Sequence, residues 1–396
     1  MKKIGIITIT RDENYGNRLQ NYAVQEVINK LGFTAETIIN TTQKGFHSKK
    51  TTASYINKLS LAHILKVLRT RTRNYLLIKN DNDGLIKSLF WKLKFKYEID
   101  VAVQKRKAAF NRFNTANIKF SNSSISMDKL DSIDIRQYEF FLCGSDQVWN
   151  PYYPQNSMID FLCFAPEEKR VAFAPSFGVN HIPEYKKESF KDWLLHIPFL
   201  SIREAQGATI IKELTGREAA VLVDPTLMLS KDEWLAIAKQ PEIDIYNKYI
   251  LTYFLGNETK AYLKAINDIA NSSSCEIINL ANMRELESYA VDPGEFIYLI
   301  NNAALVCTDS FHGAVFSMIM NTPFIVFDRI EDGHSMNSRL ENFLTKFGVE
   351  NRTFGHLNNC EDAFNMDFSN VDNYLRIEQN KAWSYLDTAF KQPVHL

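Results

Sequence analysis

The sequence predicts an α/β protein made of two doubly wound domains that face one another, and three observations lead to this prediction. Short apolar runs alternate with stretches of helical spacing along most of the 396 residues. A polar segment around residues 239–247, which contains Pro241, interrupts the alternation and marks a domain boundary. Polar motifs follow several of the apolar runs, as is typical where ligands bind at the carboxyl ends of parallel strands.

The first βαβ unit is expected at the extreme N-terminus. Residues 4–10 form an apolar run rich in β-branched residues, and a polar loop over residues 11–17 follows. Apolar residues then recur at helical spacing as far as Gly32, which stands where a helix C-cap belongs. Strand character resumes at residues 37–39. A strand, a helix and a second strand in this order predict a parallel sheet.

The same alternation continues to the end of the chain. In the first domain, residues 1–240, we expect further strands at 138–144, 170–175, 199–202 and 219–224. In the second domain, residues 246–370, strands are expected at 249–255, 275–280, 304–308 and 324–327. The segment 371–396 contains a last helix, at about 374–390, that could pack back on the first domain.

Composition and cysteine spacing exclude several classes of protein. The chain has 46 Lys and Arg residues against 46 Asp and Glu residues, so a dedicated nucleic-acid binder is not expected. The five cysteines include no C-x-x-C pair, which argues against a disulfide framework or a zinc module, and we assign no metal and no cofactor. The N-terminal apolar run is too short for a signal peptide, and no apolar stretch reaches ~20 residues. We therefore expect a cytoplasmic protein.

Residues 58–112 differ from the rest of the chain in charge. They contain 14 Lys and Arg residues against 4 Asp and Glu residues, and they are expected to form a helical insertion over 58–115 in the first domain. Charge runs are usually solvated helix faces. However, apolar residues such as Leu65, Phe90 and Trp91 lie among the lysines, as in helices that bind an anionic membrane surface. The alternative is therefore a peripheral association with the inner face of a membrane.

The loop between the first strand and the first helix is a candidate ligand-binding motif. Glycine permits close approach of the backbone, and a helix N-terminus favours an anion. The alternative is an ordinary turn in which asparagine caps the helix. The residues are Asn14, Tyr15, Gly16 and Asn17.

A second candidate motif, Gly-Ser-Asp-Gln-Val-Trp-Asn-Pro, follows the apolar run 140–143. Polar side chains at the end of a strand are placed to hydrogen-bond a ligand, and a tryptophan can stack on the face of a sugar. The alternative is a capped helix start with Trp149 as a packing anchor. The residues expected to take part are Ser145, Asp146, Gln147 and Trp149.

A third motif in the second domain supplies the main candidate for catalysis. Asp309, Ser310, His312 and Gly313 lie between the strand at 304–308 and the next helix. A histidine at this position can serve as a general acid or base, and the nearby amides can hold an anion. The alternative is a histidine that caps or packs. Asp146 and Asp309 are further acid–base candidates.

Two arginines are candidates for binding an anion. Arg203 follows the strand at 199–202, and its guanidinium fork suits a carboxylate or a phosphate. Its alternative is an ion pair with Glu204. Arg339 opens a helix and could act as a second anion clamp, or it could be a solvated helix residue.

These motifs, taken in order with residues 174–178 and 224–226, resemble the polysaccharide pyruvyl transferase family over about residues 4–345. The resemblance implies two facing α/β domains of the GT-B glycosyltransferase type. It also implies transfer of a pyruvyl group from phosphoenolpyruvate, as co-substrate, to a sugar of a surface polysaccharide or its lipid-linked precursor. The product would be a cyclic ketal, and phosphate would be released.

The resemblance also implies roles for individual residues. Arg203 matches an arginine expected to bind phosphoenolpyruvate, and His312 matches a histidine expected in acid–base work. Some members have Arg-Leu-His where this chain has Ser310, Phe311 and His312. Either Arg339 supplies the missing charge, or this chain uses a different donor.

Two other functions compete with pyruvyl transfer. A nucleotide-sugar glycosyltransferase of the same architecture would commonly place a carboxylate on the helix after the glycine-rich turn, and residues 311–323 contain neither Asp nor Glu. A non-catalytic scaffold in envelope polysaccharide assembly is the third possibility. Polar strand ends at five places argue against it.

Overall fold

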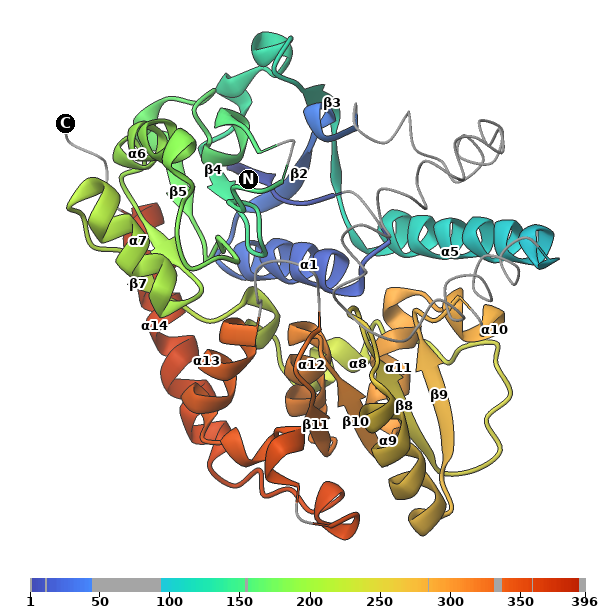
Figure 1. Ribbon diagram of the computed structural model, residues 1–396. Helices are drawn as coiled ribbons and strands as arrows, with labels where there is room; N and C mark the ends of the chain where they lie inside the picture. Colours follow the sequence, from blue (N-terminus) through green and yellow to red (C-terminus); the bar gives the residue numbers. More distant parts are fainter. Residues whose placement is uncertain are drawn as a thin grey trace, which may run out of the picture.

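The computed structural model describes residues 2–10, 13–44, 94–153, 156–283, 285–330, 337–357 and 359–391. It is an α/β protein with two main parallel sheets, one in each half of the chain, as the sequence predicts (Figure 1). Helix α1 lies between the two sheets, and one buried apolar cluster continues from the first half into the second. Among the described residues, no helix has the length and apolar character needed to cross a membrane.

The first sheet has the strand order β3-β2-β1-β4-β5, and every neighbouring pair is parallel. In the central strand, Ile4 pairs with Ala35 on one side and with Phe140 on the other. Central strands of a parallel sheet are covered on both faces, which is why β1 and β4 are continuous apolar runs. The strands are β1 (Lys3–Ile7), β2 (Thr34–Asn40), β3 (Phe120–Ile125), β4 (Phe140–Cys143) and β5 (Arg170–Ala172).

A short parallel pair, β6 (Ser201–Ile202) and β7 (Ala220–Val221), continues this layer beyond β5. The bridge between Val171 and Phe199 joins it to the main sheet. The helices of the first half are α1 (Tyr15–Lys30), α5 (Lys96–Asn117), α6 (Lys187–Leu195), α7 (Ala205–Thr215) and α8 (Lys231–Leu235).

The second sheet has the order β11-β10-β8-β9 and is also parallel throughout. Its strands are β8 (Tyr249–Tyr253), β9 (Glu276–Leu280), β10 (Leu305–Thr308) and β11 (Phe324–Val326). Its helices are α9 (Lys260–Ser273), α10 (Leu286–Tyr289), α11 (Pro293–Asn302), α12 (Phe311–Met320) and α13 (Asn337–Phe347).

The last helix, α14 (Val371–Lys391), crosses from the second half to the first. The Tyr385 hydroxyl donates to the carbonyl of Ala172 in β5 at 2.7 Å, and the Phe390 ring packs on Phe33 and Phe140. The C-terminal helix therefore contacts the first sheet.

The strand β3 and the position of α5 differ from what the sequence suggested. Residues 120–125 carry three serines and an asparagine, so their apolar content is too low to indicate a strand. Most of the basic segment 58–112 lies outside the described residues, and its membrane contact stays a prediction. The described helix α5 packs against α10 and α11 of the second half.

Candidate functional site

A polar cavity of about 180 Å³ lies between the carboxyl ends of the two sheets. In each sheet the chain reverses its order of strand addition at one place, between β1 and β4 and between β8 and β10. Loops diverge at such points and leave a crevice, which is where ligands bind in doubly wound folds. The lining comes from both halves: Ile9, Asn14, Asn17, Asp146, Gln147, Tyr153, Leu255, Ser310, Phe311, His312, Arg329 and Arg339.

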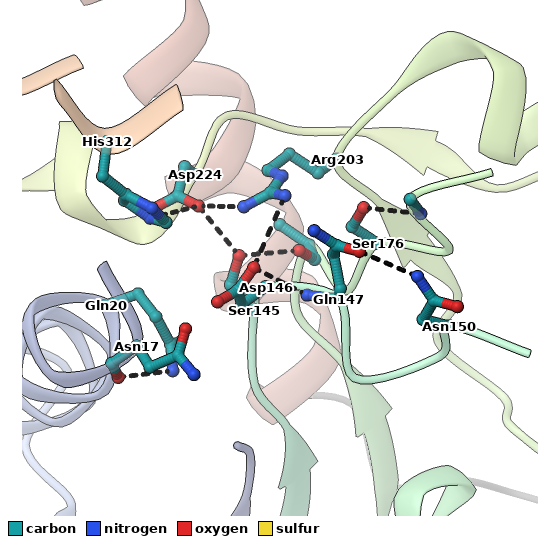
Figure 2. Close-up of polar contacts among 12 residues, drawn as sticks. Asn17, Gln20, Ser145, Asp146, Gln147, Asn150, Ser176, Arg203, Asp224 and His312 are labelled. Atoms are coloured by element: carbon teal, nitrogen blue, oxygen red, sulfur yellow. Dashed lines mark hydrogen bonds and ion pairs between the residues drawn. The ribbon is translucent and has the colours of Figure 1, made fainter. Parts of the chain in front are cut away.

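A buried ionic cluster forms one wall of the site (Figure 2). Asp224, which follows β7, accepts a hydrogen bond from Arg203 Nη1 at 2.6 Å. The same oxygen, Oδ2, lies 3.7 Å from Nε2 of His312. Asp224 comes from the first half of the chain and His312 from the second, so the pair forms only where the two halves meet.

Asp224 is a fixed negative charge beside the imidazole. Burial would raise the pKa of its carboxyl, but His312, the Arg203 guanidinium and the backbone N–H of Thr226 outweigh burial and hold the pKa well below its usual value. The carboxylate is therefore ionised at any working pH. It can stabilise a positive charge on His312 during proton transfer.

The His312 ring is buried between α12 and the start of α1. Only 7% of the residue is exposed, and Nε2 has no hydrogen-bond partner among the described residues. A Cβ added at Gly16 would overlap the imidazole. Gly16 is thus required for a close approach, as its motif suggested, but the group that approaches it is His312.

We expect Gly16→Ala to reduce turnover sharply. Alanine in a helix is ordinarily more stable than glycine by ~1 kcal/mol, so any loss must come from displacement of His312. Thermal unfolding and turnover should be compared with Gly355→Ala, where a Cβ meets nothing within 4 Å. Full activity in Gly16→Ala would show that the contact does not hold the ring in place.

Arg339 is a buried cation that lines the cavity. When the side-chain amide of Gln147 is oriented with its oxygen toward Arg339, that oxygen accepts hydrogen bonds from Arg339 Nη1 at 2.9 Å and Nη2 at 2.8 Å. Burial and the nearby positive charges of Arg203 and Arg329 lower the pKa of Arg339 to about 10, although Asp146 and Glu204 oppose this. The group stays cationic at neutral pH, but in a setting that favours arrival of an anion.

Arg203 lies behind this cavity and lines a neighbouring apolar one. Its guanidinium is 4.5 Å from the centre of the Phe311 ring, and Nη2 is 3.8 Å from Asp146. Nε and Nη2 have no hydrogen-bond partner among the described residues. Burial would lower the pKa of Arg203, but the carboxylates of Asp224, Asp146 and Glu204 outweigh burial and raise it.

The loop that carries Asp146 and Gln147 has an unusual backbone. Asp146 has φ 70° and Ala174 has φ 48°, both in the left-handed region that non-glycine residues rarely adopt. The Ser176 amide donates to the Asp146 carbonyl and joins the two turns at 2.8 Å. Glu204 supports the second turn, because its Oε1 accepts from the Ser176 hydroxyl at 2.8 Å. Residues in such strained conformations are found where several surrounding contacts hold them in place.

The structure brings half of the predicted site residues together around the cavity. Asn14 caps α1 through its side chain, and Ser310 caps α12 in the same way. Ser310 and Arg339 line the same space, although 29 positions separate them in the sequence. The predicted residues that line the cavity are Asn14, Asn17, Asp146, Gln147, Ser310, His312 and Arg339.

Two aromatic residues of the prediction are core residues. Trp149 is fully buried and stacks on Phe161 at 5.0 Å, and its indole N–H donates to the Asp160 carbonyl. It cannot stack on a sugar, so the packing alternative holds. Tyr15 is fully buried as well and stacks on Phe296 of α11 at 4.5 Å.

Three further predicted site residues form hydrogen bonds within the protein. The Ser145 hydroxyl donates to Ala174 and to Asp224. The two oxygens of Asp309 accept the amides of Leu255 and Gly256, each at 2.7 Å, and hold the loop after β8. The Gly313 amide donates to the Ser310 hydroxyl, so it is not available to an anion. We therefore leave Asp309 out of the acid–base chemistry.

Sequence reasoning missed Asp224 and Arg329. The side chain of Asp224 caps the 3₁₀ turn Pro225–Met228, so the motif at 224–226 also has a structural role. The position of Asp224 after a strand was the available signal, since the other polar motifs share it. Arg329 follows β11 and pairs with Asp309 at 3.5 Å, and nothing in its local sequence distinguishes it. Within the described ranges, no group of three or more His, Cys, Asp and Glu side chains is placed to hold a metal ion.

The chain matches one family of known proteins. The family model "Polysaccharide pyruvyl transferase" matches residues 14–330, which includes most of the cavity lining. A search of curated proteins gave no match.

Solved structures with a similar arrangement have low identity. The UDP-GlcNAc 2-epimerase from Neisseria meningitidis, bound to UDP-GlcNAc, is 10% identical with a TM-score of 0.40, and the alignment covers 97% of this chain and 100% of that one. The putative UDP-N-acetylglucosamine 2-epimerase from Listeria monocytogenes is 11% identical with a TM-score of 0.44, covering 99% and 98%. The glycosyltransferase SnogD from Streptomyces nogalater is 10% identical with a TM-score of 0.36, covering 99% and 98%.

Proposed function

The chain belongs to the polysaccharide pyruvyl transferase family and is therefore a transferase, and from this premise we propose that it moves a pyruvyl group from phosphoenolpyruvate to a sugar. The acceptor would be a surface polysaccharide or its lipid-linked precursor, and the product a cyclic ketal. The observation that carries the proposal is one cavity lined by His312, Arg329 and Arg339, with Arg203 behind its wall.

The arginines suit an anionic donor. Phosphoenolpyruvate carries a carboxylate and a phosphate, and a guanidinium fork binds either group through paired hydrogen bonds. Arg339 and Arg329 line the cavity directly. Burial, the positive charge of Arg203 and, to a smaller extent, that of Arg329 lower the pKa of Arg339. A bound anion relieves this repulsion. Arg339 thus supplies the charge that Ser310 does not, since both line the same cavity.

The reaction requires protons to move in both directions. The methylene carbon of phosphoenolpyruvate gains one proton and becomes a methyl group, while two sugar hydroxyls each lose one. Two C–O bonds to the sugar form at the central carbon, and the C–O bond to phosphate breaks, so that hydrogen phosphate leaves with the remaining proton. His312 lines the cavity, and its imidazole can serve as a general acid and as a general base. The ionised Asp224 stabilises its charged form.

Arg339→Ala is expected to weaken phosphoenolpyruvate binding. A charge-assisted hydrogen bond contributes ~1.5–3 kcal/mol, which is roughly 10–150-fold in affinity. The dissociation constant can be measured by calorimetry, with Arg376→Ala, an exposed arginine of α14, as the matched control. Unchanged affinity in Arg339→Ala would remove Arg339 from the donor site.

The proposal as a whole is tested by product formation. The full chain should be incubated with phosphoenolpyruvate and candidate sugar acceptors, including lipid-linked ones, and the products analysed by mass spectrometry with a parallel assay for released phosphate. We expect an acceptor whose mass increases by one pyruvyl ketal and an equal amount of phosphate. A chain that binds and turns over nucleotide sugars but not phosphoenolpyruvate would contradict the proposal.

A further inference from the structure

Arg106 in α5 contacts residues from both halves of the chain. It belongs to the stretch 58–112 that the sequence marked as strongly positive, yet only 5% of it is exposed. Its Nη2 donates to the carbonyl of Glu13 in the first half at 2.7 Å. Its Nη1 donates to the carbonyl of Tyr289 in α10 of the second half at 2.6 Å. One guanidinium fork therefore holds two segments that are far apart in the sequence.

The fork also holds Tyr15, the first residue of α1. Arg106 Nη1 donates to the Tyr15 hydroxyl at 3.0 Å, and that hydroxyl donates to the carbonyl of Val291 at 3.0 Å. The guanidinium carbon lies 4.8 Å from the centre of the Tyr15 ring and 4.7 Å from that of Phe110. Among the described residues, the Arg106 guanidinium thus has aromatic rings and carbonyl groups as its partners in place of a carboxylate.

A buried arginine without a carboxylate is a costly choice for packing alone. An apolar side chain of similar volume would often pack at least as stably in such a place. The particular property of arginine is its planar fork, which fixes the relative positions of several acceptors at once. Here the acceptors are the Glu13 carbonyl, the Tyr15 hydroxyl and the Tyr289 carbonyl, and they surround the start of α1.

The start of α1 also lies against the His312 ring. Glu13 and Tyr15 flank Asn14, which lines the cavity, and Gly16 follows directly with its backbone against the His312 ring. A small shift of this turn relative to the second half would move the Gly16 backbone into or away from His312. The hydrogen bonds of Arg106 join this turn to α10 of the second half.

We propose that Arg106 is a positioning residue of the active site, which locks the start of α1 to the second half and thereby sets the place of the His312 ring. Helix α5 is then a structural part of the active site, in addition to any role of the basic segment at a membrane. This inference rests on the proposed function only in treating His312 as the acid–base group.

The test uses the full chain labelled with ¹³C and ¹⁵N at histidine, so that the ring signals of His312 report its surroundings without any substrate. Arg106→Met keeps the apolar length of the side chain and removes the fork. Lys105→Ala is the matched control, because it removes one positive charge from an exposed neighbour on the same helix. The His312 signals are assigned by their absence in His312→Ala.

We expect the His312 signals to shift in Arg106→Met and to stay in place in Lys105→Ala. We also expect turnover to fall at least tenfold in Arg106→Met while the dissociation constant for phosphoenolpyruvate changes less than threefold. A folded Arg106→Met with unshifted His312 signals would overturn the proposal. If that variant does not fold, the same His312 signals are measured in Tyr15→Phe, which removes only the hydroxyl between Arg106 and Val291. Shifted His312 signals in Tyr15→Phe support the proposal, and unshifted signals refute it.

The two proposals fail separately. If the wild-type chain neither binds nor consumes phosphoenolpyruvate, the proposed function is wrong, but the His312 signals still report whether Arg106 places the ring.

Discussion

His312→Ala is expected to lose ~10²–10⁴-fold in turnover, which is the usual cost of removing one general acid–base group. The effect should fall on kcat, because the arginines proposed to bind the anion lie on other elements. Arg329 follows β11, and Arg339 belongs to α13. The fold should survive, since the alanine leaves a small space beside the cavity without burying a charge. The measurement is kcat and KM for phosphoenolpyruvate, together with thermal unfolding.

The matched control is His356→Ala. His356 is exposed, hydrogen-bonds to Thr353 and does not line the cavity. We expect it to behave like the wild type. If His312→Ala is folded and turns over at a near-normal rate, the proton transfers must be assigned to another group.

Asp224→Asn is the second change with a large expected effect, and it should act on both stability and turnover. The amide keeps the shape of the carboxylate but removes the charge, so Arg203 loses its closest counter-ion while remaining buried. Breaking a buried ion pair from one side costs ~3–5 kcal/mol. Turnover should fall as well, because the variant no longer stabilises a charged His312. Urea unfolding and kcat measure the two effects.

The pH dependence of stability gives a further check on the same variant. The pKa of Asp224 is held below its unfolded value of about 4, so the ionised carboxylate stabilises the folded state above that pH. Protonation removes this contribution as the pH falls further. The stability difference between wild type and Asp224→Asn should therefore be full at neutral pH and shrink below about pH 4.

The control for these measurements is Asp131→Asn, at an exposed aspartate of the 3₁₀ turn Leu130–Ser132. It should change neither stability nor turnover. An Asp224→Asn variant as stable as the wild type at neutral pH would mean that the Arg203 charge has another adequate partner.

Much of the fold was predictable because its signals are local. The strands β1, β4, β8 and β10 are buried on both faces, so each is a continuous apolar run that can be recognised in the sequence. The polar motifs after these runs were likewise recognisable, since the carboxyl ends of parallel strands meet at one edge. By contrast, β3 is an edge strand with little apolar character, and no local pattern predicted it.

The candidates for a catalytic histidine and for a second anion-binding arginine also came from the sequence. Strand-end position and family resemblance indicated His312, and the absence of an arginine at Ser310 directed attention to Arg339. The structure places both beside one cavity. The roles of Trp149 and Asp309 could not be predicted, because a side chain at a strand end can point into the core or into the crevice with the same sequence.

The sequence by itself determined the α/β class, the apolar strands at the centre of each sheet and the family, because each depends on local spacing and on ordered motifs. Only the tertiary structure decided which polar side chains face the cavity and which hold the protein together. Asp224 and His312 are 88 positions apart, and Gly16 and His312 are 296 apart. Their contacts depend on how the two halves dock, which is set by packing among buried groups such as Arg106 and Tyr15 rather than by any pattern within one segment.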